Sequence, residues 1–193
     1  MSYFLAAALG YLLGSIMVAP RLAVRHGIDL YQTSDGNPGA WNALEQLGPR
    51  RAWVAFAGDG AKAAWAGGVG LAAGGWWAGW AGVAGAIIGH ALPVWRHGRG
   101  GKGVMCFVGG MVVLSPLAWL ICLALCGVVT VARGFAWGAR VGVFALPFVQ
   151  LATDPVTHVE GTGVLMGLVG ALFFIRGRTR ADARSGSGAP PRA

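Results

Sequence analysis

The chain alternates long apolar stretches with short polar segments, and this pattern constrains its fold more than any other feature. Of its 193 residues 55% are hydrophobic and only 11% are charged, whereas a soluble domain carries about 25% charged residues. Uncharged segments of this length are what membrane-spanning helices require. The sequence therefore predicts one all-α domain, a polytopic transmembrane helical bundle over residues 1–177. Its apolar stretches run at about 3–19, 52–73, 76–94, 104–132, 140–153 and 161–176.

The stretch 104–132 decides how many times the chain crosses the membrane. As one straight helix its 29 residues would span ~43 Å, too long for a hydrocarbon core of ~30 Å without strong tilt. Ser115-Pro116 lies near its middle, and proline breaks a helix because it lacks an amide hydrogen and clashes with the preceding turn. We therefore expect two segments here, 104–114 and 117–132, and about seven membrane segments in all.

The positions of the basic residues favour the same count. If 104–132 crosses twice, all basic clusters share one face, as the positive-inside rule requires, with the N-terminus outside and the C-terminus in the cytoplasm. This orientation explains the net charge of +8, which does not indicate a nucleic-acid partner. Residues 178–193 are expected to form a disordered basic tail that can touch anionic lipid. The basic clusters are Arg21/Arg25/Arg50/Arg51, Arg96/Arg99/Lys102, Arg133/Arg140, and the residues from Arg176 onward.

Glycine spacing indicates where helices can pack closely. Small residues four apart let two helix backbones approach each other within a membrane. In a chain with 34 glycines such pairs also arise by chance, so both explanations stay open for each pair. The pairs with this spacing are Gly70/Gly74, Gly75/Gly79, Gly85/Gly89 and Gly163/Gly167.

Two glycine-rich polar loops fall on the face assigned to the cytoplasm. In the first, residues 35–39 read DGNPG, which is turn chemistry: glycines permit positive φ and proline fixes φ near −65°. The second, residues 97–104, reads HGRGGKGV and lacks the spacing of a Walker loop. Its glycine amides, flanked by Arg99 and Lys102, can still form an anion-binding nest. Plain connecting loops with a basic surface remain the alternative for both segments.

Three ionisable residues lie within apolar helices or at their edges. Asp59 and Lys62 are three residues apart on one helical face, and His90 lies one turn before Pro93. Charges in such places are costly and are usually functional or paired. An ion pair is the structural alternative for Asp59 and Lys62, and a buried, hydrogen-bonded imidazole is the alternative for His90.

Taken together, these residues resemble the bacterial acyl-phosphate:glycerol-3-phosphate acyltransferase family of integral membrane enzymes. The resemblance covers roughly residues 10–176 and rests on the order and spacing of several short motifs. The family is described as seven-helical, with an external N-terminus and cytoplasmic motifs. The motifs are YLLGSI (11–16), GNPGAxN (36–42), LG (47–48), GDxxK (58–62), GHxxPVW (89–95), GGKGV (100–104) and LSPL (114–117).

The resemblance implies transfer of a fatty acyl group from acyl phosphate to the 1-hydroxyl of glycerol 3-phosphate, which forms lysophosphatidic acid in phospholipid synthesis. It implies a multi-pass protein of the bacterial cell membrane, surrounded by membrane lipid, and leaves its oligomeric state open. Acyl phosphate is already activated, so the chemistry requires no metal, no coenzyme A and no other cofactor. The implied catalytic residues are Lys102 and His90, and the implied substrate-binding residues are Gly36, Asn37, Gly39, Asn42, Asp59, Lys62, Gly100, Gly101 and Gly103.

Three positions depart from the family's usual Gly-Ser-Gly-Asn-Pro-Gly-Ala-Thr-Asn motif and the arginine that follows it. Asp35 stands at the serine, Trp41 at the threonine and Glu45 at the arginine. The repulsion between a carboxylate and a substrate phosphate ~4 Å away costs on the order of 1–4 kcal/mol. We therefore expect weakened use of glycerol 3-phosphate, and two alternatives stay open: an acyltransferase with a changed acceptor, and a non-catalytic membrane homologue.

Overall fold

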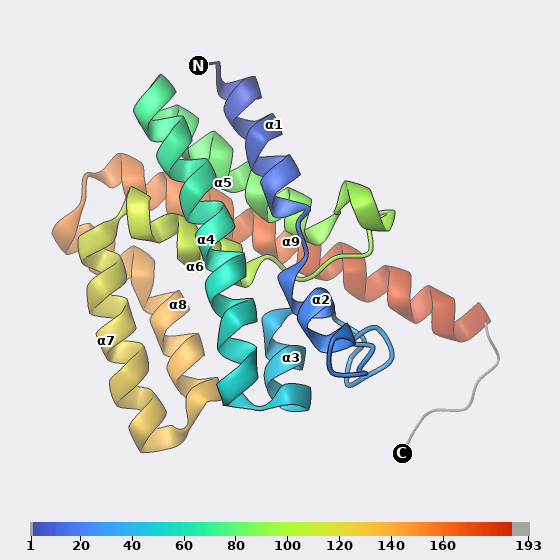
Figure 1. Ribbon diagram of the computed structural model, residues 1–193. Helices are drawn as coiled ribbons and strands as arrows, with labels where there is room; N and C mark the ends of the chain where they lie inside the picture. Colours follow the sequence, from blue (N-terminus) through green and yellow to red (C-terminus); the bar gives the residue numbers. More distant parts are fainter. Residues whose placement is uncertain (1, 187–193) are drawn as a thin grey trace.

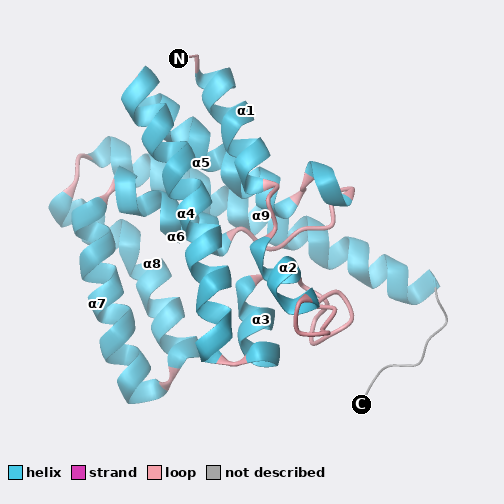
Figure 2. Cartoon of the chain, in the orientation of Figure 1, coloured by secondary structure: helices cyan, strands magenta, loops and turns pink. Residues whose placement is uncertain are grey.

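The computed structural model describes residues 2–186, and all regular structure in that range is helical (Figure 2). The all-α fold class predicted from the sequence is confirmed. The helices are α1 (Tyr3–Gly14), α2 (Val18–Val24), α3 (Ala40–Leu47), α4 (Pro49–Gly74), α5 (Trp76–Ala91), the 3-10 turn η1 (Val94–Arg96), α6 (Val104–Leu114), α7 (Pro116–Arg133), α8 (Phe135–Thr153) and α9 (Val156–Gly186).

Five segments are long and apolar enough to cross a membrane. Two further helices lie between these segments in the sequence. Helix α4 is 26 residues long and buries Asp59 and Lys62, and α6 is apolar but only 11 residues long. These seven segments correspond to the seven predicted from the sequence, although the number that span the membrane stays a prediction. The five long apolar segments are Tyr3–Val24, Trp76–Arg96, Pro116–Arg133, Phe135–Thr153 and Val156–Ile175.

One end of the bundle, which we call the loop face, carries two polar loops. The first loop, residues 25–39, joins α2 to α3, and the second loop, residues 92–103, joins α5 to α6. The α7–α8 connection reaches the same end, because the ring of Phe135 stacks on that of Trp41 with centroids 5.5 Å apart. The loop face therefore gathers segments that are far apart in the sequence, as Figure 1 shows for α2, α3 and the start of α4.

The opposite end, which we call the far face, holds the break between α6 and α7. Ser115 ends α6 with φ −155° and ψ 66°, and Pro116 begins α7. The Ser115 hydroxyl donates to Asp154 Oδ2 at 2.9 Å, while Trp76 stacks on His158 at 4.1 Å. The chain thus turns back at the far face, and the predicted division of residues 104–132 into two segments is confirmed.

Close packing between α1 and α5 depends on glycine. A Cβ atom added to Gly85 or Gly89 would meet carbonyl oxygens of α1, so close helix packing is the explanation that fits this pair. An added Cβ at Gly163 or Gly167 would have no atom within 4 Å among the described residues. The chance explanation is therefore the one that fits that pair, which lies on an open side of α9.

The C-terminal segment differs from the expected disordered tail. Helix α9 continues through residues 178–186, and Figure 1 shows its end extending past the other helices. Alanine and arginine are favourable helix formers, so a helix that has already begun can continue through this segment. Residues 187–193 of the expected tail lie outside the described residues.

Candidate functional site

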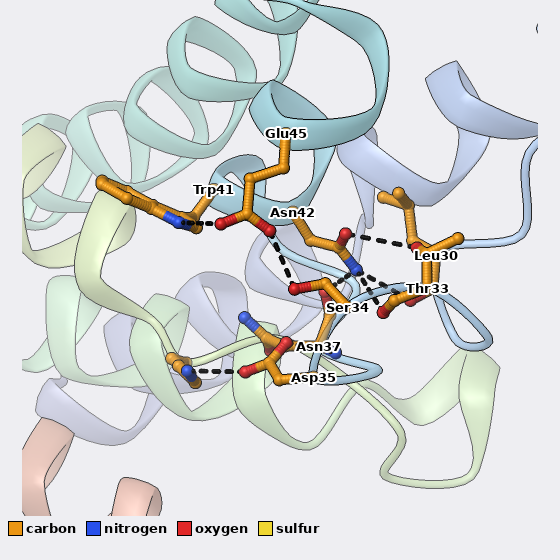
Figure 3. Close-up of polar contacts among 9 residues, drawn as sticks. Leu30, Thr33, Ser34, Asp35, Asn37, Trp41, Asn42 and Glu45 are labelled. Carbon is orange, nitrogen blue, oxygen red and sulfur yellow. Dashed lines mark hydrogen bonds and ion pairs between the residues drawn. The ribbon is translucent and has the colours of Figure 1, made fainter. Parts of the chain in front are cut away.

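The first loop is folded around the side chain of Asn42, which is 1% exposed. Asn42 Nδ2 donates to the carbonyl oxygens of Leu30 at 2.9 Å, Thr33 at 3.1 Å and Asn37 at 3.0 Å (Figure 3). Its Oδ1 accepts a hydrogen bond from Thr33 Oγ1 at 3.2 Å. Asn42 therefore holds the loop closed on α3, and its predicted contact with substrate stays a prediction.

The turn DGNPG is built as its sequence predicts. Asp35 Oδ1 accepts from the Asn37 amide at 2.9 Å, and Gly36 has φ +69°, with the Tyr31 carbonyl oxygen 3.0 Å from where a Cβ would lie. Gly39 is the N-cap of α3, and its backbone lies against the side-chain amide of Asn37. Asn37 is 5% exposed, and its Oδ1 has no hydrogen-bond partner among the described residues. This buried acceptor can receive a hydrogen bond from a ligand.

The two loops meet at an ion pair between Lys102 and Asp35. Lys102 Nζ lies 2.9 Å from Asp35 Oδ2, and the side chains are 34% and 47% exposed, respectively. The ammonium also lies 4.6 Å from the centre of the Phe173 ring in α9. An exposed pair of this kind contributes little to stability, so its members can separate. The cation predicted to hold phosphate is thus engaged by the acidic residue that replaces the family's serine.

Glu45 and Trp41, the other two departures, are bonded to each other. Trp41 Nε1 donates to Glu45 Oε1 at 2.7 Å, and Ser34 Oγ donates to Glu45 Oε2 at 2.8 Å (Figure 3). Ser34 has φ +50°, which is uncommon for a residue other than glycine. Glu45 therefore fixes a strained residue of the first loop, Ser34, which directly precedes the DGNPG turn.

The glycines of GGKG let the second loop lie on the last turn of α5. The Gly101 amide donates to the His90 carbonyl oxygen at 2.9 Å, and a Cβ on Gly101 would meet His90 Nε2. A Cβ on Gly100 would meet the same carbonyl oxygen, while Gly103 has φ +80° and packs on Ile87. Close packing accounts for these glycines, and the Gly101 amide is already occupied. The predicted phosphate contacts of Gly100, Gly101 and Gly103 stay predictions.

Beneath the second loop, Asp59, Lys62 and His90 form a buried polar cluster. Lys62 Nζ lies 2.9 Å from Asp59 Oδ1 and from His90 Nδ1, and it donates to the Ile16 carbonyl oxygen at 2.8 Å. The three side chains belong to residues that are 1%, 8% and 3% exposed. The ion pair anticipated as the structural alternative is present, and it joins the C-terminal side of α1 to α4 and α5. Substrate binding by this pair and catalysis by His90 stay predictions.

A cleft of about 670 Å³ opens on the loop face, and sequence reasoning missed it. None of the catalytic or substrate-binding residues implied by the resemblance lines it, although Arg99, which flanks the predicted anion-binding nest, does. The signal that could have found it is the basic cluster directly after α5, because that segment lies against the first loop. The cleft is lined by Pro20, Val24, Asp29, Tyr31, Gln32, Trp95, Arg96, His97 and Arg99.

Comparison with known proteins decides the family. The family model described as glycerol-3-phosphate acyltransferase matches residues 4–184. This chain belongs to the glycerol-3-phosphate acyltransferase family. Relatives named glycerol-3-phosphate acyltransferase include that of Synechococcus sp. (strain JA-3-3Ab), 33% identical over 100% of this chain and 94% of the relative. The relative from Roseobacter denitrificans is 37% identical over 88% of this chain and 84% of its own length.

Solved structures share the fold of this acyltransferase-family chain. The glycerol 3-phosphate form of PlsY, an integral membrane glycerol 3-phosphate acyltransferase, matches with a TM-score of 0.76 and 24% identity, covering 100% of this chain and 96% of PlsY. The lysophosphatidic acid form has a TM-score of 0.76 and 23% identity, with 95% and 94% covered. The resemblance drawn from the motifs is confirmed, and the chain is a membrane protein of this acyltransferase family.

Proposed function

We propose that this chain transfers a fatty acyl group from acyl phosphate to the 1-hydroxyl of glycerol 3-phosphate. Membership of the acyltransferase family supports the reaction. The observation that supports its location is the partly exposed ammonium of Lys102, which lies where the two loops of the loop face meet. A mobile cation at such a junction can neutralise a phosphate that both loops approach.

The proposed reaction needs few protein groups. The hydroxyl oxygen of the acceptor attacks the acyl carbonyl carbon, the bond from that carbon to the phosphate oxygen breaks, and inorganic phosphate leaves. The hydroxyl proton passes to the leaving phosphate. Asn37 Oδ1, buried and without a partner among the described residues, can accept from a substrate hydroxyl and so orient it. Lys102 would neutralise the negative charge of the phosphate group.

Asp35 competes with substrate phosphate for Lys102. The carboxylate already holds the ammonium at 2.9 Å, so a phosphate must displace it or share the cation with it. Sharing would place two anions close together, which costs on the order of 1–4 kcal/mol at ~4 Å. We therefore propose that glycerol 3-phosphate binds this chain more weakly than it would if the family's serine stood at this position.

The same ion pair favours a second candidate, an acyltransferase whose acceptor is a neutral or cationic alcohol. Such an acceptor would not have to displace Asp35 from Lys102, and it would not be repelled by the carboxylate. Glu45, which replaces an arginine of the usual motif, also removes a positive charge from α3. The family chemistry at the acyl carbon would be unchanged, and only the acceptor would differ.

We also propose that the loop face lies in the cytoplasm and that the protein is embedded in a bacterial cell membrane. The support is the charge distribution. The basic residues of the second loop and Arg133, at the end of α7, belong to the loop face, and the positive-inside rule retains such residues in the cytoplasm. Acyl phosphate and glycerol 3-phosphate would then both reach the loops from the cytoplasmic side.

The test is mass spectrometry of lipids formed by the purified full-length protein in detergent. Acyl phosphate is supplied with glycerol 3-phosphate, glycerol or ethanolamine as the acceptor. Lysophosphatidic acid from glycerol 3-phosphate is the expected product. An acylated product from glycerol or ethanolamine alone would establish the second candidate instead. If folded protein forms no acylated product with any acceptor, both proposals are wrong.

A further inference from the structure

We infer that the cleft lined by Arg96, His97 and Arg99 is a second anion site, and that it binds a phosphate monoester. We call it the basic cleft. It lies between α2, the first loop and η1, whereas the Asp35–Lys102 pair joins the C-terminal part of the first loop to the end of the second. The inference depends on the residues that line the cleft and does not require the proposed acyl transfer.

The charge balance of the basic cleft is positive, because two arginines and one carboxylate line it. Asp29 is its one acidic lining residue, and both of its oxygens accept hydrogen bonds within the first loop. Oδ1 accepts from the Tyr31 amide at 3.0 Å, and Oδ2 accepts from Gln32 Nε2 at 2.9 Å. Among the side chains of residues 2–175, neither Arg96 nor Arg99 forms an ion pair with Asp29 or with another carboxylate. The lining therefore holds two guanidinium groups against one carboxylate, and that carboxylate is held within the first loop and pairs with neither of them.

Backbone geometry brings these two arginines together. The Arg99 amide donates to the Arg96 carbonyl oxygen at 3.0 Å, which closes a tight turn, and His97 within that turn has φ 49°. The guanidinium carbons of Arg96 and Arg99 lie 5.9 and 5.3 Å from the centre of the Tyr31 ring. The Tyr31 hydroxyl donates to the Arg99 carbonyl oxygen at 3.0 Å. The ring thus fixes both the turn and the positions of the two cations.

Two guanidinium groups that line one cleft repel each other, and a dianion bound in the cleft would offset that repulsion. Guanidinium binds phosphate through paired N–H donors, so two of them suit a group that offers three terminal oxygens. A phosphate monoester has both the charge and the oxygens.

The rim of the basic cleft leaves two sources for this ligand. Trp95 is 61% exposed and Val24 is 63% exposed, so apolar side chains border the cationic centre, as at a membrane interface. A free phosphate monoester would enter from the aqueous side, whereas the headgroup of phosphatidic acid would enter from the membrane. The chemistry recognised is the same in both cases.

Binding of ligand to the full-length protein in nanodiscs tests the inference, in an experiment with two arms. Both arms use protein that carries Lys102→Ala, so that ligand bound at the Asp35–Lys102 pair does not contribute to the signal. In the first arm, glycerol 3-phosphate is titrated calorimetrically into nanodiscs of neutral lipid. In the second, native mass spectrometry measures the phosphatidic acid retained from nanodiscs that contain it. Each arm compares Arg96→Gln/Arg99→Gln with the control Arg50→Gln/Arg51→Gln, which removes the same charge from exposed positions of the loop face.

In at least one arm, the Arg96/Arg99 variant should bind the ligand of that arm at least about tenfold more weakly than the Lys102→Ala protein does. The affinity of the Arg50/Arg51 control should stay within about twofold of that protein's. The arm that responds identifies the source. No binding in either arm, or equal losses in variant and control, would overturn the inference. Acyl transfer is measured separately, so its absence with the binding intact would refute only the proposed function.

A measurement on the chain without arginine substitutions guards against misfolded variants. Phenylglyoxal modifies accessible guanidinium groups, and peptide mass spectrometry locates the modified residues. The ligand from the responding arm should slow modification of Arg96 and Arg99 by at least about threefold and leave Arg50 and Arg51 unchanged. Equal modification rates with and without ligand would also overturn the inference.

Discussion

At the scale of single residues, Asp35 and Glu45 set the expected preference for the acceptor. The change Asp35→Ser with Glu45→Arg releases Lys102 from its carboxylate and returns a cation to α3. We expect KM for glycerol 3-phosphate to fall by about tenfold or more, since repulsion is removed at position 35 and replaced by attraction at position 45. Steady-state kinetics with acyl phosphate in excess gives this value.

The control for that experiment is Glu160→Ser, which removes an exposed carboxylate from the first turns of α9, near the far face. Its KM should match that of the unmodified chain. If the double change leaves KM unaltered, Asp35 does not compete for Lys102.

The sequence shows which residues depart from the family's motif, but it does not show which residues they contact. Asp35 and Glu45 were recognisable as departures because the surrounding motif is continuous in the sequence. Their partners were not, because the Asp35–Lys102 contact depends on how two loops 67 residues apart meet. The glycine-rich pattern at Gly101 likewise predicts a phosphate cradle, whereas its amide donates to the His90 carbonyl oxygen. Flexible backbone suits both uses, so composition alone cannot separate them.

At the scale of helices, two glycine-to-alanine substitutions test the close packing of α1 on α5. One lies in that contact, and the other, on α9, is its control. Gly89→Ala would place a Cβ against a carbonyl oxygen of α1 and should destabilise the protein by about 1–3 kcal/mol, as overpacking does. Gly163→Ala meets no atom within 4 Å among the described residues and should be neutral or slightly stabilising. Thermal unfolding in detergent compares them. Equal Tm values for both variants would contradict the packing.

The junction of α8 and α9 should respond to acid. Burial raises the pKa of the Asp154 carboxyl, but hydrogen bonds from Thr153, His158 and Ser115 outweigh it, so the net pKa lies below the ordinary 3.8. The ionised carboxyl therefore stabilises the folded chain above about pH 4. That contribution is lost as the pH falls below 3.8 and through the lowered pKa.

The variant Asp154→Asn isolates this effect because it keeps the shape and removes the charge. At pH 7 its Tm should be lower than that of the unmodified chain by roughly 2–6 °C. The difference should shrink as the pH is lowered from 5 to 3, as scanning fluorimetry in detergent would record. A constant difference across that range would exclude Asp154 as the titrating group.

Helix boundaries were predictable where local chemistry decides them. The break at Pro116 follows from proline's missing amide hydrogen, and the charge clusters required the same reversal. The continuation of α9 to Gly186 was not predictable, because a basic, alanine-containing segment suits both a helix and a disordered tail. The basic cleft was missed for a related reason: it exists only where η1 approaches the first loop.

At the scale of the whole molecule, the orientation in the membrane can be tested directly. Single cysteines are introduced at the exposed positions Gln46, Arg133 and Thr157 after the native cysteines are replaced. An impermeant thiol reagent applied to intact cells should label Thr157→Cys on the far face, and should label the other two only after the membrane is opened. Opposite accessibility of the Gln46 and Arg133 positions would contradict the seven-segment arrangement.

The proposed function itself depends most directly on Lys102. Acyl transfer from acyl phosphate to glycerol 3-phosphate is measured for the purified protein, for Lys102→Ala, and for Arg51→Ala as a control that removes an exposed loop-face cation. We expect kcat/KM for glycerol 3-phosphate to fall at least about 100-fold in Lys102→Ala and to stay within about twofold in Arg51→Ala. Turnover of Lys102→Ala equal to that of the unmodified protein would contradict a phosphate site at the junction of the two loops.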